Sequence, residues 1–369
     1  MFDVDPAGRA PNSVKLLLIL LLCVLPLDRA EAESFPGKTW NEPADPEIHG
    51  WSAAKLAEAR TYSEALDTAA VMIVHDGVLI DAWGDIARAY PAASIRKSLL
   101  SALYGIQVAK GTIGLSDTLE DLGIEDEPPG LTPDERQARV VDLLMARSGV
   151  YHPAAGETAY MKDRRPRRGS HAPGEFWYYN NWDFNVLGTI YETAAQEEIV
   201  PSLVRFIAAP LQMQDFDRDD GGYFFEKSSR HPAYYVQVTA RDLARFGLLY
   251  LREGRWRDRQ VVPAAWVRKS TSQLSNIWPT TYGHADGPTT MGYGYLWWAG
   301  RDEGFLPGVD LHTRAYRAYG HRGQYVIVIP ARNLVVVHLV DRWDPTEYVS
   351  FQQMGTLLSM ILEAAPEQP

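Results

Sequence analysis

Two hairpins rich in β-branched residues lie at opposite ends of this 369-residue chain, and they constrain its fold more than any other feature. In the first, the apolar runs 70–75 and 78–83 flank Asp76-Gly77, a dipeptide typical of a tight hairpin turn. In the second, the runs 325–330 and 334–340 contain so much Val and Ile that both faces of these strands are expected to be buried. Both hairpins are therefore expected to join one central sheet.

The sequence between the hairpins is typical of helices joined by long loops. Apolar periodicity predicts helices over 140–146, 185–195, 201–209 and 239–253, and further helices near the hairpins over 51–66, 99–109 and 347–364. We therefore predict an α/β (α+β) fold, in which an antiparallel sheet built from N- and C-terminal hairpins is flanked by helices and carries an inserted helical lobe. The expected division is a sheet domain over 33–110 and 290–369 and a mainly helical domain over 111–289.

Ser94 and Lys97 stand one helical turn apart, directly before the predicted helix 99–109. At this spacing the two side chains share a helix face, and a buried lysine with a lowered pKa can take the proton of a serine hydroxyl. The same spacing occurs in Ser52-Ala-Ala-Lys55, where it opens an Ala-rich, charged helix, so Ser52 is expected to be an N-cap. Ser94 instead follows a predicted sheet and precedes an apolar helix, whose N-terminus favours negative charge. From these residues alone, Ser94 is either a nucleophile or a second N-cap.

The aromatic segment 173–181 offers a Tyr-x-Asn triplet in two registers. Tyr178 with Asn180 is one, and Tyr179 with Asn181 is the other. A phenol can relay a proton and an amide can hold a substrate carbonyl, so either register is suited to acyl transfer.

The segment that leads into the C-terminal hairpin contains His321, Arg322, Gly323 and Gln324 in sequence. A glycine at this position lets a ligand approach the strand backbone closely. The Gln324 N–H can then donate to an oxyanion.

The N-terminus and the composition indicate the compartment and the class of partner. An apolar run over 16–27 followed by Ala30-Glu31-Ala32 predicts a signal peptide over 1–32, and hence a secreted or periplasmic protein, with a retained anchor as the alternative. The run is too short to span a bilayer comfortably, so we expect no stable membrane span after cleavage. The net charge of −11 argues against nucleic-acid partners. No metal-ligand spacing or phosphate loop is found, so no metal or cofactor is implied.

Together these motifs resemble the serine β-lactamase and penicillin-binding protein superfamily, in which Ser-x-x-Lys, Tyr-x-Asn and a third basic-x-Gly motif follow in this order. The resemblance is strongest to the class C β-lactamase-like branch, which includes family VIII carboxylesterases, D-alanyl-D-alanine peptidases and 6-aminohexanoate-dimer hydrolases. Further signatures of the branch are found over 143–149, 173–181, 242–247, 254–256 and 293–298. The segment 173–181 matches with Tyr179, which selects the Tyr179 and Asn181 register.

The resemblance implies a covalent mechanism. Ser94 attacks the carbonyl, Lys97 and Tyr179 share its proton, and His321 assists when the proton is returned to the leaving group. The N–H groups of Ser94 and Gln324 stabilise the oxyanion.

The resemblance also implies the substrate-binding residues. Asn181 positions the acyl side chain and Gly323 admits the ligand. True β-lactamases usually carry Lys-Thr-Gly where this chain has His321-Arg322-Gly323, and Arg322 either contacts a substrate carboxylate or points to solvent.

We therefore predict an exported serine hydrolase that acts through an acyl-enzyme on small-molecule ester, amide or peptide substrates without a cofactor. A true β-lactamase is the alternative within the same enzyme class. A catalytically slow penicillin-recognising protein that binds cell-wall ligands is the alternative from another class. The sequence predicts no particular oligomeric state.

Overall fold

The computed structural model describes residues 33–43, 45–277, 291–301, 305–341, 343–344 and 346–367. The chain from Glu33 onward forms one compact unit. The predicted signal peptide over 1–32 lies outside the described residues. Within the described residues, the helices are all too short or too polar to cross a membrane.

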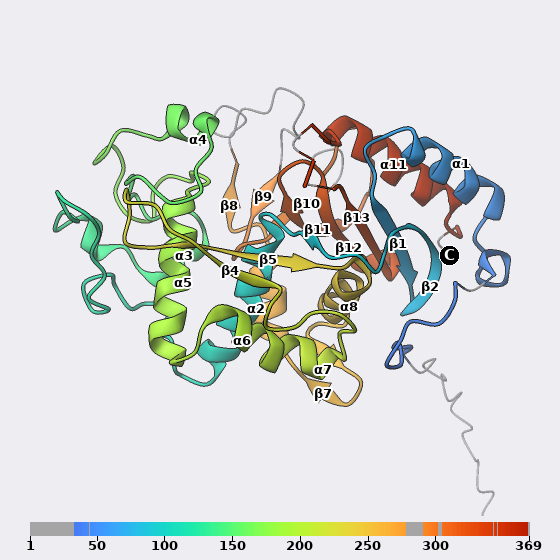
Figure 1. Cartoon of the computed structure of the whole chain (residues 1–369), viewed down its shortest axis with the longest axis horizontal. Helices are drawn as coiled ribbons and strands as arrows, with labels where there is room; N and C mark the ends of the chain where they lie inside the picture. The colour runs from blue at the N-terminus through green and yellow to red at the C-terminus, as the bar shows by residue number, and fades with distance from the viewer. Residues whose placement is uncertain are drawn as a thin grey trace, which may run out of the picture. The chain divides into compact units, whose positions relative to one another are not determined.

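In the described residues, eight strands form one antiparallel sheet in the order β2-β1-β13-β12-β11-β10-β9-β8 (Figure 1). The strands are β1 (Ala70–His75), β2 (Val78–Gly84), β8 (Ser275–Asn276), β9 (Gly292–Tyr293), β10 (Trp298–Arg301), β11 (Arg314–Gly320), β12 (Gln324–Ile329) and β13 (Leu334–Leu339). Strand β1 pairs with β13, with Ile73 opposite Val336, so the two predicted hairpins meet side by side. All residues of β12 and β13 are buried, as the Val- and Ile-rich sequence predicts.

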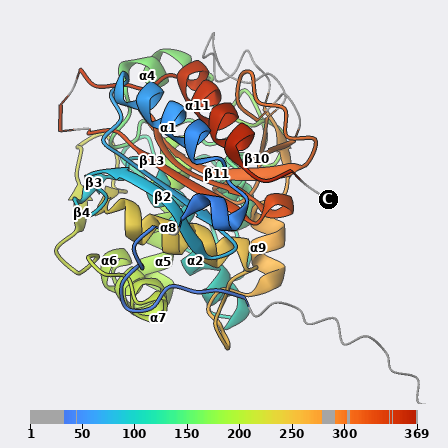
Figure 2. The same ribbon diagram turned by 90° about the vertical axis from the view of Figure 1, so that its right-hand side faces the viewer.

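Helices cover both faces of this sheet (Figure 2). The N- and C-terminal helices α1 (Ala53–Glu64) and α11 (Phe351–Ala364) lie side by side on one face, and α2 (Ile95–Ala109) and α8 (Ala240–Leu251) cover the other. Gly247 allows α8 to pack closely, because a Cβ there would lie 2.5 Å from Cγ1 of Val335. Helix α8 falls within the predicted insert 111–289, so part of that insert packs against the central sheet. The two-domain division stays a prediction.

The remaining α-helices and strands lie outside the central sheet, and the longest of them is α5 (Asn181–Ala195) (Figure 1). The others are β3 (Tyr90–Pro91), α3 (Val140–Leu144), α4 (Ala159–Arg164), α6 (Ile199–Leu203), α7 (Ala209–Leu211), β4 (Gly221–Phe224), β5 (Ala233–Val238), β6 (Arg255–Trp256), β7 (Arg259–Gln260) and α9 (Ala264–Ser270). The predicted mainly helical lobe is therefore present, with the short sheet β3-β5-β4 beside it.

Buried hydrogen bonds fasten the loop before α5 to the helix itself. The Asp183 carboxylate accepts hydrogen bonds from Ser148 Oγ at 2.5 Å and from Asn180 Nδ2 at 2.8 Å. Asn180 is also the N-cap of α5, because its side chain accepts from the Trp182 N–H. These contacts fix the chain immediately around residue 179.

The observed elements confirm the predicted fold class and differ in two places that matter for the site. Helix α2 begins at Ile95, directly after Ser94, rather than at residue 99. Strand β11 was not predicted, because its sequence contains two arginines. One of them, Arg317, is nonetheless fully buried, with its guanidinium 4.9 Å from the ring centroid of Phe305 and 5.5 Å from that of Phe351.

Candidate active site

Ser94 precedes the first residue of α2 but does not cap the helix. Its backbone is helical (φ −80°, ψ −5°), and its side chain makes no capping hydrogen bond. Its Oγ instead accepts a hydrogen bond from Lys97 Nζ at 2.7 Å. The preceding residue, Ala93, has a φ of +48°, a left-handed conformation that is uncommon outside glycine. The structure therefore favours the nucleophile over the N-cap for Ser94.

Ser52, which shares the same motif spacing, behaves as the predicted N-cap. Its side chain accepts a hydrogen bond from the Lys55 N–H at 3.4 Å. Lys55 Nζ turns away and donates to the carbonyl of Glu363 at 3.1 Å on the exposed surface. The two Ser-x-x-Lys motifs thus have different geometries, and only Ser94 is paired with its lysine side chain.

Aromatic rings enclose the Lys97 side chain next to Ser94. Its Nζ lies 4.8 Å from the ring centroids of both Tyr179 and Phe184. Burial lowers the pKa of Lys97 well below its ordinary value, and the neighbouring charge of Arg96 lowers it further. A lowered pKa makes the neutral amine more accessible, and a neutral amine can accept the serine proton.

The Arg96 guanidinium is almost completely buried beside this lysine. Its Nε donates to the carbonyl of Tyr234, and the guanidinium lies 4.7 Å from the Tyr234 ring centroid. No carboxylate among the described residues forms an ion pair with Arg96.

The structure brings Tyr179, not Tyr178, to the serine. Burial raises the pKa of Tyr179 to about 12, although a hydrogen bond with Ser94 and the charge of Arg96 oppose this shift. The Tyr179 ring stacks on Trp298, with centroids 5.4 Å apart. The Tyr178 hydroxyl points elsewhere and donates to the carbonyl of Met161 at 2.9 Å.

Asn181 begins α5 and lies next to this cluster in the chain. Its Nδ2 donates to the carbonyl of Gly156 at 2.9 Å. Its Oδ1 is buried and has no hydrogen-bond partner within the described residues. This unused acceptor is the part of Asn181 that is suited to substrate binding.

His321, Arg322 and Gly323 form the turn between β11 and β12, with the His321 side chain exposed. Arg322 Nη1 donates to the carbonyl of Asp344 at 3.1 Å, and its own carbonyl accepts from the Val349 N–H at 3.2 Å. Arg322 thus contacts the backbone of the segment that follows β13.

Gly323 and Gln324 also contact the chain that follows β13. Gly323 has a φ of +106°, and a Cβ there would lie 3.0 Å from Cγ2 of Val340 and from Cβ of Val349. The Gln324 amide makes two hydrogen bonds with the Val340 backbone, at 3.0 and 3.2 Å. Gly323 is therefore closely packed in the structure, and its role in ligand approach stays a prediction.

Gly320, at the end of β11, is the glycine that touches the segment before Ser94. A Cβ on Gly320 would lie 2.6 Å from the carbonyl oxygen of Ala92 and 3.0 Å from Cβ of Ala93. The absence of a side chain at Gly320 thus lets the end of β11 pack closely against the segment before Ser94.

The arrangement supplies a hydroxyl, an amine with a lowered pKa and a phenol within one hydrogen-bonded cluster of Ser94, Lys97 and Tyr179. Such a cluster can move a proton off the serine and return it to a leaving group. In the part of the chain that the structure describes, no group of three or more His, Cys, Asp and Glu side chains is placed to hold a metal ion.

Comparison with known proteins identifies the family. A family model described as Beta-lactamase matches residues 53–357, which is most of the chain. The chain belongs to the beta-lactamase family. Within this family, it is 29% identical over 201 residues to the 6-aminohexanoate-dimer hydrolase of Paenarthrobacter ureafaciens, a match that covers 52% of this chain and 46% of that hydrolase.

Solved structures share the fold of this chain. A class C beta lactamase from Rhodobacter sphaeroides matches with a TM-score of 0.58 and 16% identity, over 85% of this chain and 99% of that chain. The octameric penicillin-binding protein homologue from Pyrococcus abyssi matches with a TM-score of 0.60 and 17% identity, over 85% and 77%. The resemblance and the fold predicted from the sequence are confirmed, and the protein is a member of a hydrolase family.

Proposed function

We propose that this beta-lactamase-family protein is an exported serine hydrolase that cleaves ester or amide bonds of small-molecule or peptide substrates through an acyl-enzyme, without a cofactor. The observation that carries the proposal is the 2.7 Å hydrogen bond between Lys97 Nζ and Ser94 Oγ, with Tyr179 hydrogen-bonded to the same serine. Export rests on the signal peptide predicted over 1–32.

In the first half of the reaction, the Ser94 proton passes to the Lys97 and Tyr179 pair as Oγ attacks the carbonyl carbon. The resulting oxyanion accepts hydrogen bonds from the N–H groups of Ser94 and Gln324, an interaction worth about 3–4 kcal/mol in comparable sites. The tetrahedral intermediate then collapses. The bond to the leaving alcohol or amine breaks, and that group takes the proton from Tyr179.

In the second half, water attacks the Ser94 ester and loses its proton to the same pair. The acyl–oxygen bond to Ser94 breaks, the carboxylic acid leaves, and the serine regains its proton. Lys97 and Tyr179 share one proton with Ser94 throughout, so the apparent pKa values of the reaction belong to the cluster rather than to one residue.

Hydrolysis of p-nitrophenyl butyrate by the wild type, Ser94→Ala and Ser52→Ala tests this proposal. We expect Ser94→Ala to lower kcat/KM by about 10³-fold or more. Ser52→Ala is the matched control, and we expect it to retain activity because Ser52 only caps α1. Equal activity in wild type and Ser94→Ala contradicts the proposal.

A substrate panel then separates the related activities. Fast turnover of simple esters or amides with poor β-lactam turnover supports an esterase or amidase, and efficient β-lactam turnover identifies a β-lactamase. Acylation of Ser94 without turnover identifies a penicillin-recognising binding protein and contradicts the proposed hydrolase.

A further inference from the structure

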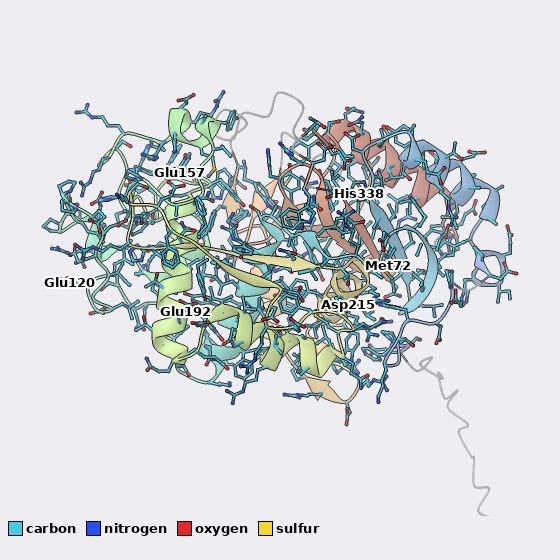
Figure 3. The ribbon with its side chains drawn as sticks, viewed as in Figure 1. Met72, Glu120, Glu157, Glu192, Asp215 and His338 are labelled. Carbon is cyan, nitrogen blue, oxygen red and sulfur yellow. The ribbon has the colours of Figure 1, made fainter. Side chains whose placement is uncertain are left out.

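His338 is a fully buried polar side chain in β13, among valines and leucines. Figure 3 labels it within the sheet, far along the chain from the Ser94 helix. Its Nδ1 lies 2.7 Å from the carbonyl oxygen of Gly323, and its Nε2 lies 3.0 Å from Thr68 Oγ1. Both ring nitrogens therefore have a partner. Nδ1 contacts the turn beside the active site, and Nε2 contacts Thr68, which lies just before β1.

The partners of the ring determine its tautomer. A carbonyl oxygen can only accept a hydrogen bond, so Nδ1 carries the proton and donates to Gly323. Burial lowers the pKa of His338 to about 4, so the ring is neutral near pH 7. Nε2 then accepts from the Thr68 hydroxyl. The imidazole is thus fixed in one orientation from both sides.

The carbonyl that His338 holds belongs to the turn that enters the active site. This turn begins directly after Gly320, which contacts Ala92 and Ala93 next to the nucleophile. The Val349 N–H and the Gln324 side chain also tie the turn to the chain after β13. His338 is the contact that comes from inside the sheet. The Gly323 carbonyl belongs to the same peptide group as the Gln324 N–H, so the bond from His338 orients that N–H and polarises it.

We propose that His338 is a positioning residue that fixes the Gly323–Gln324 peptide at the end of the turn 321–323, so that the Gln324 N–H is held ready to bind the oxyanion. The inference rests on the proposed function, because it needs a tetrahedral intermediate on Ser94. Oxyanion donors act only when they are held close to the position of the developing charge, and a misplacement of about 1 Å costs about 10²-fold in rate. His338 therefore acts through the backbone and does not touch the substrate.

The test compares His338→Val with His338→Asn in the full chain. Valine fits the β13 environment but donates no hydrogen bond, whereas the Asn amide nitrogen occupies about the position of Nδ1 and retains the donor to Gly323. The two measurements are kcat and KM for p-nitrophenyl butyrate and the inhibition constant of phenylboronic acid, which forms a tetrahedral adduct with the serine.

We expect His338→Val to lower kcat by about 10- to 100-fold with little change in KM. We expect it to weaken phenylboronic acid by a similar factor, and His338→Asn to recover most of both losses. Unchanged kcat and boronate inhibition in folded His338→Val overturn the proposal. So does a loss that Asn fails to recover while the fold is intact.

A third variant keeps the proposal testable if His338→Val does not fold. His338→Gln places its amide nitrogen at about the position of Nε2, nearer Thr68 than Gly323, so it should show the kcat loss that His338→Asn does not. Equal kcat in the Asn and Gln variants overturns the proposal. Full activity in Ser94→Ala instead signals failure of the proposed function itself.

Discussion

Replacement of Lys97 by methionine separates a catalytic lysine from a structural one. Methionine is unbranched and apolar, so it fills the space between the Tyr179 and Phe184 rings but cannot take the Ser94 proton. General-base catalysis contributes about 10²- to 10⁴-fold, so kcat/KM should fall by that factor, equivalent to about 3–5 kcal/mol of transition-state stabilisation.

Whereas activity should fall, the free energy of unfolding of Lys97→Met should rise or stay nearly unchanged. The substitution loses the hydrogen bond to Ser94, worth about 1 kcal/mol, and removes an amine that is only 2% exposed, whose burial costs about 1–3 kcal/mol. The free energy of unfolding of Lys97→Met should therefore equal or exceed that of the wild type, by up to about 2 kcal/mol.

The assay is p-nitrophenyl butyrate hydrolysis together with urea denaturation. Lys55→Met is the matched control, because Lys55 only contacts the Glu363 carbonyl at the surface, and we expect its activity to be unchanged. Retained activity in Lys97→Met refutes the reasoning. A loss of stability of several kcal/mol also refutes it, because the lysine would then be structural.

Three further predictions follow from the same geometry. Tyr179→Phe should lower kcat by about 10²-fold or more, whereas Tyr178→Phe should retain activity, because only Tyr179 is hydrogen-bonded to Ser94; steady-state kinetics of the pair checks this. Arg96→Gln should raise the pKa of Lys97 and move the acidic limb of the kcat/KM–pH profile to higher pH, whereas Arg96→Lys should leave the limb in place. Hydrogen bonds from His152 and Arg168 lower the pKa of Glu135 from 4.5 to about 2 despite its burial, so its stabilising effect is full above pH 4.5 and lost as pH falls toward 2. Acid unfolding of wild type and Glu135→Gln should therefore differ in that window.

The sequence predicts the parts of the fold that have strong local signals. The two hairpins are identified because their Val- and Ile-rich runs flank clear turns, and the paired strands β1 and β13 confirm that both join one sheet. Ser52 is correctly predicted as an N-cap because its surroundings are charged and Ala-rich. Ser94 lies in an apolar context, and its side chain pairs with Lys97 rather than with the helix backbone.

The contacts around the start of β12 could not be predicted from the local sequence. Strand β11 contains Arg314 and Arg317, and Arg317 is buried with its guanidinium near the rings of Phe305, which precedes the strand, and of Phe351 in α11. Because such tertiary contacts override local propensity, Gly320 is not recognisable from its neighbours as the glycine that touches Ala92. The role of His338 is equally invisible, since a histidine within a run of valines carries no signal of the carbonyl that it holds.

Identification of the residue that becomes covalently modified tests the central claim most directly. The purified protein is treated with a serine-reactive fluorophosphonate, and the modified peptide is located by mass spectrometry. We predict one stoichiometric adduct on the peptide that contains Ser94, with Ser52 unmodified and with labelling abolished in Ser94→Ala. An adduct on another residue, or ester hydrolysis that continues while Ser94 stays unmodified, would contradict the account.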